Sequence, residues 1–471
     1  MQSTPLKKSK AQTIKSATAK DTKQTPQPPD PPVEVDPALV SANGDLVLAV
    51  KRQLENQADD VFLYRVESKR LREASPYFAR LLDPDKFGEG AQVKESHSVL
   101  RTRYPSPAAV PLEELPQVDV ADVGRISSNV KSIRNLMGDF LRALHDAHLA
   151  VKIPPLANVA NMLVVADRFD ALAAVRQYFE RRKLIAALDA TRGQNSKSGT
   201  KPEPEERVRQ RLLVGLFLDN PSWVWSSSLR LIHKGWLGRE TDVTSALWWD
   251  LPQGIEEELL FRRDCILESI QSLQTHFLHL YTCRDRQCKL GYDSSAECDL
   301  YQLGQMVKFF RKINTLNLQG RLISTTPEGE PCETEQDFYY DADLFDLLDE
   351  FRKAPEYQID KNHRHCGLRT RLLPLIDLVS LSLSSEVGLC LNCWQESRNE
   401  YAWSRVKRPL IWTHGSAGAG MASRYRDGQT QRHLFRHLDA RDLFVAKERV
   451  WTTSDEGRVG IGWSHPNLPY K

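Results

Sequence analysis

The sequence predicts an α+β protein, with a small sheet wrapped by helices in the N-terminal part and a mainly α-helical part after it. Two short runs rich in β-branched and aromatic residues, at 44–50 and 61–66, are typical of a strand pair. Apolar residues then recur at helical spacing in several segments further along the chain. All ten Trp lie between Trp223 and Trp463, so the second part is expected to have a separate aromatic-rich core.

Composition excludes several classes of protein. The 471 residues include 64 Lys and Arg against 62 Asp and Glu, and this net charge of +2 gives no polyelectrolyte signal for nucleic acid or anionic lipid. Eight Cys are ordinary for this length, so reduced thiols are expected. The longest apolar segment, 372–394, is interrupted by Asp377 and Glu386, which predicts a buried helix and no membrane span. The first residues lack the apolar region of a secretory signal, so we expect an intracellular protein of the nucleus, the cytoplasm or both.

Two polar segments divide the chain. Residues 1–37 are rich in Lys, Thr, Gln, Ser and Pro and almost free of aromatics, which predicts a disordered tail. Its KKSK run is consistent with a short import signal or with solvated lysines. Residues 191–206 have a similar bias and predict a linker. The predicted units are therefore 38–190, a helical region 207–400, and a basic, Trp-containing, partly ordered region 401–471.

Local signals predict the elements of the first unit in order. After the strand pair, Ser75 is placed to cap a helix that begins at Pro76. A Pro-containing connection follows at 91–127. Apolar residues at i, i+3, i+4 and i+7 then predict a helix over 133–144, a second after Pro154 and Pro155, and a further helix over 172–188.

The order of these segments resembles a known family. GDLVLAV, then VESKRLREASPYFARLL, then FGEG, a helix and ANMLVVADRFDALAAVRQYFERR is similar to the BTB (POZ) domain, in the form found in many filamentous-fungal proteins. The resemblance covers about 38–190. It implies a mixed sheet capped by helical hairpins that self-associates and docks protein partners, without catalytic activity of its own. Segments 247–263, 287–310 and 365–379 resemble the helical region that accompanies this domain in those proteins.

Phe87 and Glu89 are the predicted partner-binding residues. In cullin-binding BTB domains a hydrophobic residue, any residue and then Glu follow this helix, so the resemblance implies that Phe87 fills a cullin pocket beside a contact from Glu89. The chain would then be a ubiquitin-ligase adaptor. In the alternative, Phe87 closes the core of its own domain and 87–90 form a turn, because Gly88 and Gly90 flank Glu89.

The second unit begins with a long predicted helix. Apolar residues keep helical spacing over 255–281, which corresponds to about seven turns at 3.6 residues each. A coiled-coil dimer face is one interpretation. The spine of a helical domain is favoured, because the apolar face is wider than an a/d seam.

Cysteines and histidines gather in the second unit and suggest a zinc site. Zinc takes four N or S ligands, usually supplied as short-spaced pairs. We therefore treat the following residues as candidate ligands: Cys283, Cys288, Cys298, His365, Cys366, Cys390 and Cys393, with His363 in the same cluster of the sequence. Only Cys390 and Cys393 show the C-x-x-C spacing, and they are equally explained as thiols packed as small hydrophobic groups.

No pattern of residues predicts catalysis. The Gly-rich segment 414–423 has neither the order of a phosphate-binding loop nor that of a hydrolase nucleophile, which favours a plain loop. We therefore predict a non-enzymatic protein-interaction module that forms a homodimer or recruits a partner. An alternative is a nuclear regulator that contacts nucleic acid through 401–471. This region contains 12 Lys and Arg but only 6 Asp and Glu, and four Trp lie among them: Trp403, Trp412, Trp451 and Trp463. A third is an enzyme whose pocket lies in the Trp-rich part.

Overall fold

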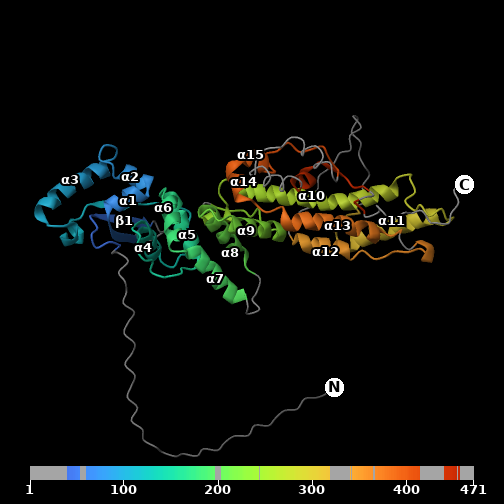
Figure 1. The fold of residues 1–471 in the computed structure, drawn as a ribbon, viewed down its shortest axis with the longest axis horizontal. Coiled ribbons are helices and arrows are strands. Elements are labelled where there is room, and N and C mark those ends of the chain that lie inside the picture. The colour runs from blue at the N-terminus through green and yellow to red at the C-terminus, as the bar shows by residue number, and fades with distance from the viewer. Residues whose placement is uncertain are drawn as a thin grey trace, which may run out of the picture. The chain divides into compact units, whose positions relative to one another are not determined.

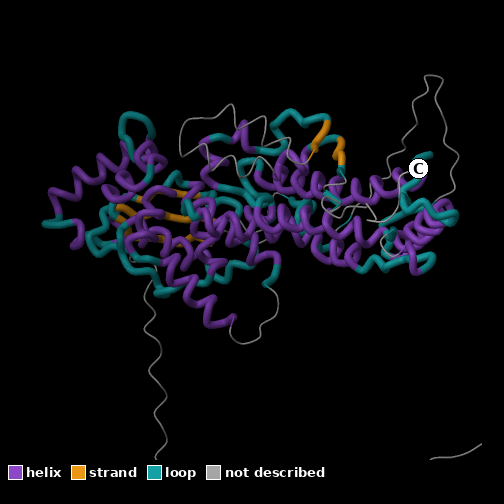
Figure 2. The backbone as a smooth tube through the Cα atoms, turned by 45° about the vertical axis from the view of Figure 1, so that its right-hand side comes forward, coloured by secondary structure: helices purple, strands orange, loops and turns teal. Residues whose placement is uncertain are grey.

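The fold is a mixed α+β structure with a small three-stranded sheet, a further strand pair and many helices, in agreement with the predicted class (Figures 1 and 2). A computed structural model of the chain describes residues 40–52, 60–196, 203–242, 244–318, 340, 342–363, 366–413, 440–452 and 455–456. These residues all belong to one compact unit of the chain. One main hydrophobic core contains residues of both parts, so the expectation of a separate aromatic-rich core in the second part is wrong. The predicted tail lies outside the described residues, and so does the Gly-rich segment 414–423.

The sheet contains the predicted strand pair and a third strand that the sequence reasoning missed. Strands β1 (Leu46–Arg52) and β2 (Asp60–Val66) are antiparallel, which confirms the pair. Strand β3 (Gln117–Val120) runs parallel to β1, and the order is β2-β1-β3. The segment 91–127 is therefore not a simple connection, because it supplies β3 and most of helix α3 (Gly88–Arg103). Two short 3-10 helices, η1 (Pro107–Ala109) and η2 (Leu112–Glu114), lie between them.

Both faces of β1 are covered. Leu46, Leu48 and Val50 face the main hydrophobic core. On the other face, Val47 packs in a smaller cluster with Leu100 of α3 and two residues of the segment that follows, Val110 and Leu115. Helix α3 buries only Gly90, Val93 and Leu100, so it shows no apolar stripe that would have revealed it in the sequence.

The helices next to the sheet begin where local signals place them. Helix α1 (Ser68–Ala74) leads directly into α2 (Pro76–Leu81). The Ser75 hydroxyl accepts the Phe78 backbone N–H at 3.1 Å, which confirms the predicted cap. The same hydroxyl donates to the Phe169 carbonyl at 2.6 Å, so the cap also joins α2 to a distant part of the domain.

The remaining helices of this part follow the predicted periodicity, with one correction. Helices α4 (Ile133–Leu144) and α5 (Leu156–Arg168) lie where they are predicted. Segment 172–188 is not one helix but contains α6 (Leu172–Arg181) and the start of α7 (Leu184–Ser196), because Lys183 adopts a left-handed φ of 50°. Residues 191–196 and 205–206 of the predicted linker are helical, and 197–202 lie outside the described residues.

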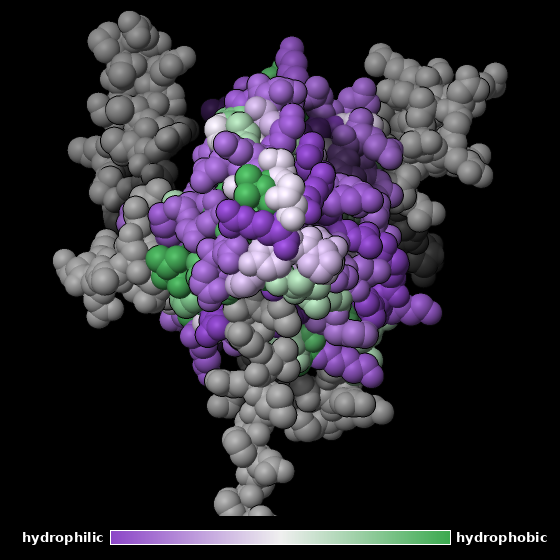
Figure 3. All heavy atoms as spheres, turned by 90° about the vertical axis from the view of Figure 1, so that its left-hand side faces the viewer, coloured by the Kyte–Doolittle hydropathy of each residue, from purple (hydrophilic) through white to green (hydrophobic). Residues whose placement is uncertain are grey.

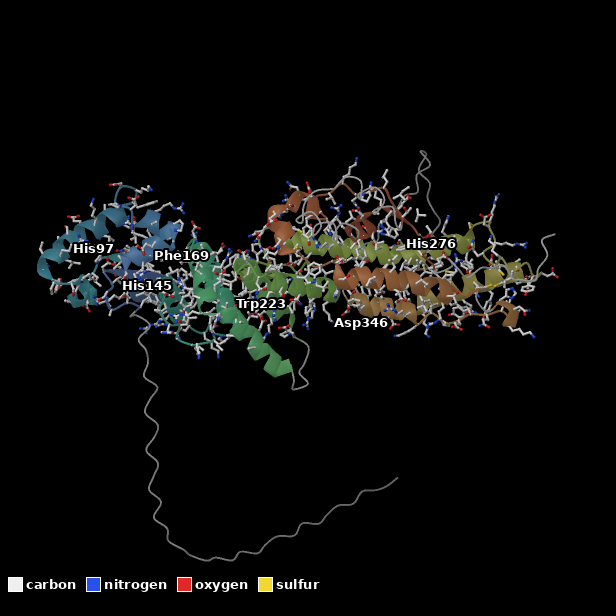
Figure 4. All side chains as sticks on the ribbon, viewed as in Figure 1. His97, His145, Phe169, Trp223, His276 and Asp346 are labelled. Carbon is white, nitrogen blue, oxygen red and sulfur yellow. The ribbon has the colours of Figure 1, made fainter. Side chains whose placement is uncertain are left out.

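His145, labelled in Figure 4, links stability to pH. Its Nδ1 donates to the Leu141 carbonyl at 2.8 Å and its Nε2 accepts the Glu67 backbone N–H at 3.0 Å, so the ring is held neutral. Burial lowers the pKa of His145 below its usual value of 6.5. As pH falls below about 6.5 the unfolded chain binds the proton first, so the free energy of unfolding should decrease there and stay constant above about pH 7.

Urea unfolding at a series of pH values checks this prediction. His145→Gln preserves an acceptor for Glu67 but does not titrate, and it should flatten the decrease below about pH 6.5. His148→Gln, which replaces an exposed histidine three residues further on, is the control. An identical pH dependence in His145→Gln and the unmodified chain would contradict the prediction.

The second part is built on one long helix. It contains the following elements: α8 (Glu205–Phe217), α9 (Pro221–Lys234), η3 (Leu247–Trp249), α10 (Ile255–Thr282), α11 (Ser295–Lys312), α12 (Leu344–Arg352), η4 (Lys361–His363), α13 (Leu368–Ser385), α14 (Leu391–Glu396) and α15 (Arg398–Tyr401). Helix α10 matches the helix predicted over 255–281 and packs against α9, α11 and α13 (Figure 1). This packing agrees with the interpretation of α10 as the spine of the helical region.

Part of the region 401–471 folds back onto this helical region. Strands β4 (Ile411–Thr413) and β5 (Glu448–Val450) form a parallel pair that the sequence reasoning did not predict, and β5 lies against α10. Helix α13, from the apolar segment 372–394, buries Leu372, Ile376 and Val379. Within the part of the chain that is described, no helix combines the length and the apolar character needed to cross a membrane.

Candidate functional site

Phe87 lies at the start of α3 with its ring in solvent. It is 49% exposed and is the N-cap residue of that 16-residue helix. The predicted alternative, in which Phe87 closes the core and 87–90 form a turn, is therefore wrong, because these residues begin a helix on the surface.

A close backbone contact fixes the backbone at the start of α3. A Cβ added at Gly90 would lie 2.5 Å from the carbonyl carbon of Asp83, so only glycine lets α3 pack this tightly on the preceding turn. The Phe87 backbone N–H also donates to the Asp83 carbonyl at 3.2 Å. The start of α3 therefore packs directly on the turn that contains Asp83.

Glu89 lies two residues beyond Phe87, in the first turn of α3, and is also exposed. A carboxylate there stabilises the helix through the positive end of its dipole. Figure 3 faces the end of the molecule that carries α3 and shows a mainly hydrophilic surface with separate hydrophobic spots.

The predicted zinc ligands do not all come together. Cys283 is exposed, and its thiol donates to the Leu280 carbonyl at 3.0 Å. Cys390 and Cys393 belong to the main hydrophobic core at the start of α14, where the pKa of Cys393 is raised by a hydrogen bond with Cys390 and by burial. His365 lies outside the described residues.

Four other donors meet instead, and we call them the Cys/His cluster: Cys288, Cys298, His363 and Cys366. The thiols of Cys288 and Cys298 and a ring nitrogen of His363 all lie within 4.8 Å of one another. The three Cys form a separate small core, and the Cys366 and Cys288 Sγ atoms are 3.7 Å apart. Three of the predicted ligands, Cys288, Cys298 and Cys366, therefore lie together, and His363 lies beside two of them, Cys288 and Cys298.

Each member of the Cys/His cluster comes from a different local element. Cys288 lies in the loop after α10, where its backbone N–H donates to Asp299 Oδ1 at 2.9 Å. Cys298 lies in the first turn of α11, His363 ends η4, and Cys366 precedes α13. The Cys366 carbonyl accepts the Tyr281 hydroxyl at 3.1 Å, which ties this end of α10 to the cluster.

His363 is held in one orientation. Its side chain is fully buried, and Nδ1 lies 2.9 Å from Asp360 Oδ1. The hydrogen bond with His363 lowers the pKa of Asp360, so the carboxylate is charged and Nδ1 carries the proton. Nε2 has no hydrogen-bond partner among the described residues.

Burial raises the pKa of two thiols of the cluster, Cys298 and Cys366. Burial, followed by the nearby Cys288, raises the pKa of Cys298 to about 12. Burial also raises the pKa of Cys366, with further contributions from Cys298 and Cys288. Such thiols are poor nucleophiles, so the arrangement suits packing or metal binding better than covalent catalysis.

The described tryptophans of 401–471 do not form a nucleic-acid surface. Trp403, Trp412 and Trp451 are all buried. Arg408 donates to the Val445 carbonyl at 2.7 Å, and Arg449 donates to the Leu443 carbonyl at 2.8 Å. Trp463 lies outside the described residues. These aromatic rings are therefore not available for base stacking.

A cleft of about 620 Å³ lies beside α4, α5 and α8. Its charged lining residues are Lys131, Asp139, Glu206 and Arg207. Neither His nor Cys is among the residues that line it, so it offers no nucleophile paired with an imidazole base.

Comparison with known proteins gives no relative: no model of a protein family, no curated protein and no solved structure matches this chain. The class that the structure itself defines is a mixed α+β protein with a three-stranded sheet and an extended helical region. The similarity to BTB domains stays a prediction from the sequence.

Proposed function

We propose that this chain is a non-catalytic protein-interaction module whose N-terminal part recruits a cullin-type scaffold through Phe87. The observation that carries the proposal is the exposure of Phe87 at the start of α3, with Glu89 exposed two residues further along the same helix. An exposed aromatic side chain on a rigid element is the usual kind of anchor in a protein interface.

The topology of residues 46–181 also supports the proposal. It contains an antiparallel strand pair, the short helices α1 and α2, the longer helix α3, a strand parallel to β1 and then three helices. The BTB resemblance implies a mixed sheet capped by helices, and this arrangement agrees with that expectation. Ser68 donates its hydroxyl to Asp45 Oδ2 at 2.7 Å, which holds the start of α1 against the sheet.

Binding of the full chain to a purified cullin N-terminal region, measured by titration calorimetry, tests the proposal. The unmodified chain should bind at micromolar concentration, and Phe87→Ala should weaken binding by about 30-fold or more, because loss of a central anchor costs about 2 kcal/mol. Val99→Ala is the matched control, since Val99 is 44% exposed on the same helix and should change binding by less than about twofold.

Two outcomes would contradict this function. Absence of binding to any cullin at about 100 μM would remove the adaptor proposal, because the proposal expects binding at micromolar concentration. Equal weakening by Phe87→Ala and Val99→Ala would show that Phe87 is not an anchor. Light scattering of the same chain tests the self-association that the resemblance implies, and a monomer mass at high concentration would exclude it.

A further inference from the structure

We propose that the Cys/His cluster is a structural zinc site with Cys288, Cys298, Cys366 and His363 Nε2 as its four ligands. This inference is independent of the function proposed for the N-terminal part.

The donor set is the one that zinc prefers. Three thiolates and one imidazole form a Cys₃His set, which is common in closed tetrahedral sites. Three of the donors already lie within 4.8 Å of one another. Zn–S bonds of about 2.3 Å in a tetrahedron separate two sulfurs by about 3.8 Å. The observed distance between the Cys288 and Cys366 sulfurs is 3.7 Å.

The buried imidazole of His363 favours a metal site over the alternative, in which the thiols pack only as hydrophobic groups. Packing accounts for three buried Cys, but it does not explain a fully buried imidazole whose Nε2 has no partner among the described residues. Asp360 occupies Nδ1, which leaves Nε2 as the nitrogen for a metal. A carboxylate on the far nitrogen is the usual support of a zinc-bound histidine, since it fixes the ring and its tautomer.

The site would be structural. Four protein ligands leave no open position for substrate or water. On binding, each of the three thiols releases its proton to solvent, and three sulfurs and Nε2 each share a lone pair with the ion, without any change in oxidation state. The ion would join the loop after α10, the first turn of α11 and the segment between η4 and α13. Two of its ligands, Cys288 and Cys366, are 78 residues apart in the sequence.

Metal analysis of the full chain, purified under reducing conditions and supplied with zinc alone, tests the proposal. The unmodified chain should hold about one zinc that is lost in Cys288→Ser, Cys298→Ser, Cys366→Ser and His363→Ala, with less than about 0.2 zinc remaining. Cys283→Ser removes an exposed thiol outside the cluster and should retain the full amount. His363→Cys replaces one zinc donor by another, so it should retain zinc. Comparison with His363→Ala then shows whether zinc is lost because a ligand is missing or because the protein no longer folds.

Two further measurements use the same proteins. The Co²⁺ form should show the visible absorption of a tetrahedral site together with thiolate charge transfer, and both should disappear in Cys298→Ser. A zinc chelator should lower the Tm of the unmodified chain by about 5 °C or more and leave that of His363→Ala unchanged.

Several results would overturn the zinc site. One is a reduced, unmodified chain that holds no zinc after exposure to excess metal. Another is zinc that remains in all four cluster variants, which would place the ion elsewhere in the chain. A third is a disulfide between Cys288 and Cys366 in the native protein, found by peptide mapping without reduction.

Discussion

Glu258→Ala is expected to lower the free energy of unfolding by about 3–5 kcal/mol, because it leaves the charge of Arg262 buried without its partner. Both side chains of this ion pair are completely buried, and Arg262 Nε donates to Glu258 Oε1 at 2.8 Å. Removing one member of such a pair costs far more than removing a surface ion pair, which contributes about 0–1 kcal/mol.

The pair also joins α10 to segments that are distant in the sequence. Glu258 accepts the Trp403 backbone N–H at 2.8 Å and the Ser404 hydroxyl at 2.7 Å. Arg262 donates to the carbonyls of Val387 and Gly388 at 3.0 and 2.9 Å. Loss of the carboxylate therefore leaves two buried donors, Arg262 Nε and the Trp403 N–H, without this acceptor, which adds to the cost.

Urea unfolding followed by Trp fluorescence measures this effect. Glu257→Ala is the matched control, because Glu257 precedes Glu258 on α10 and is exposed, and it should change stability by less than about 0.5 kcal/mol. If Glu258→Ala lowers the free energy of unfolding by less than about 1 kcal/mol, water reaches Arg262 and the ion pair is not buried in solution.

Phe78→Ala is expected to destabilise the N-terminal part by about 3–5 kcal/mol, the usual cost of truncating a buried Phe. Phe78 is fully buried and stacks on Phe169 with 5.2 Å between ring centroids. Phe169, labelled in Figure 4, also stacks on Phe140 at 5.7 Å. Truncation of Phe78 would leave a cavity at the centre of this group of rings.

Phe87→Ala is the control, since it makes the same chemical change nine residues further along the chain. Its ring is 49% exposed, so the loss should stay below about 1 kcal/mol. Thermal unfolding of both variants gives the comparison. Equal destabilisation would mean that Phe87 is buried in solution, and it would remove the basis for treating this residue as a partner anchor.

The sequence alone determined the elements that depend on near neighbours. Helix α4 begins and ends where the apolar spacing places it, and α2 begins at Pro76 after the Ser75 cap. Both signals act within one or two helical turns, so these helices can be predicted from the local sequence alone. Strand β3 and helix α3 were missed for the opposite reason. The parallel pairing of β3 with β1 joins residues about 70 positions apart, and α3 has no continuous apolar face.

For the candidate sites, the sequence supplied residue types, and only the tertiary structure decided which of them meet. The short spacing of His363 and Cys366 was visible in the sequence, yet Cys390 and Cys393 matched the usual zinc pair more closely. The packing of α10, α11 and α13 places Cys288 and Cys298 beside Cys366, whereas Cys390 and Cys393 lie in the main core. Phe87 is equally suited to a core or an interface until the fold places it in solvent. Spacing along the chain reports contacts within a few turns, while contacts between distant segments depend on how the whole core packs.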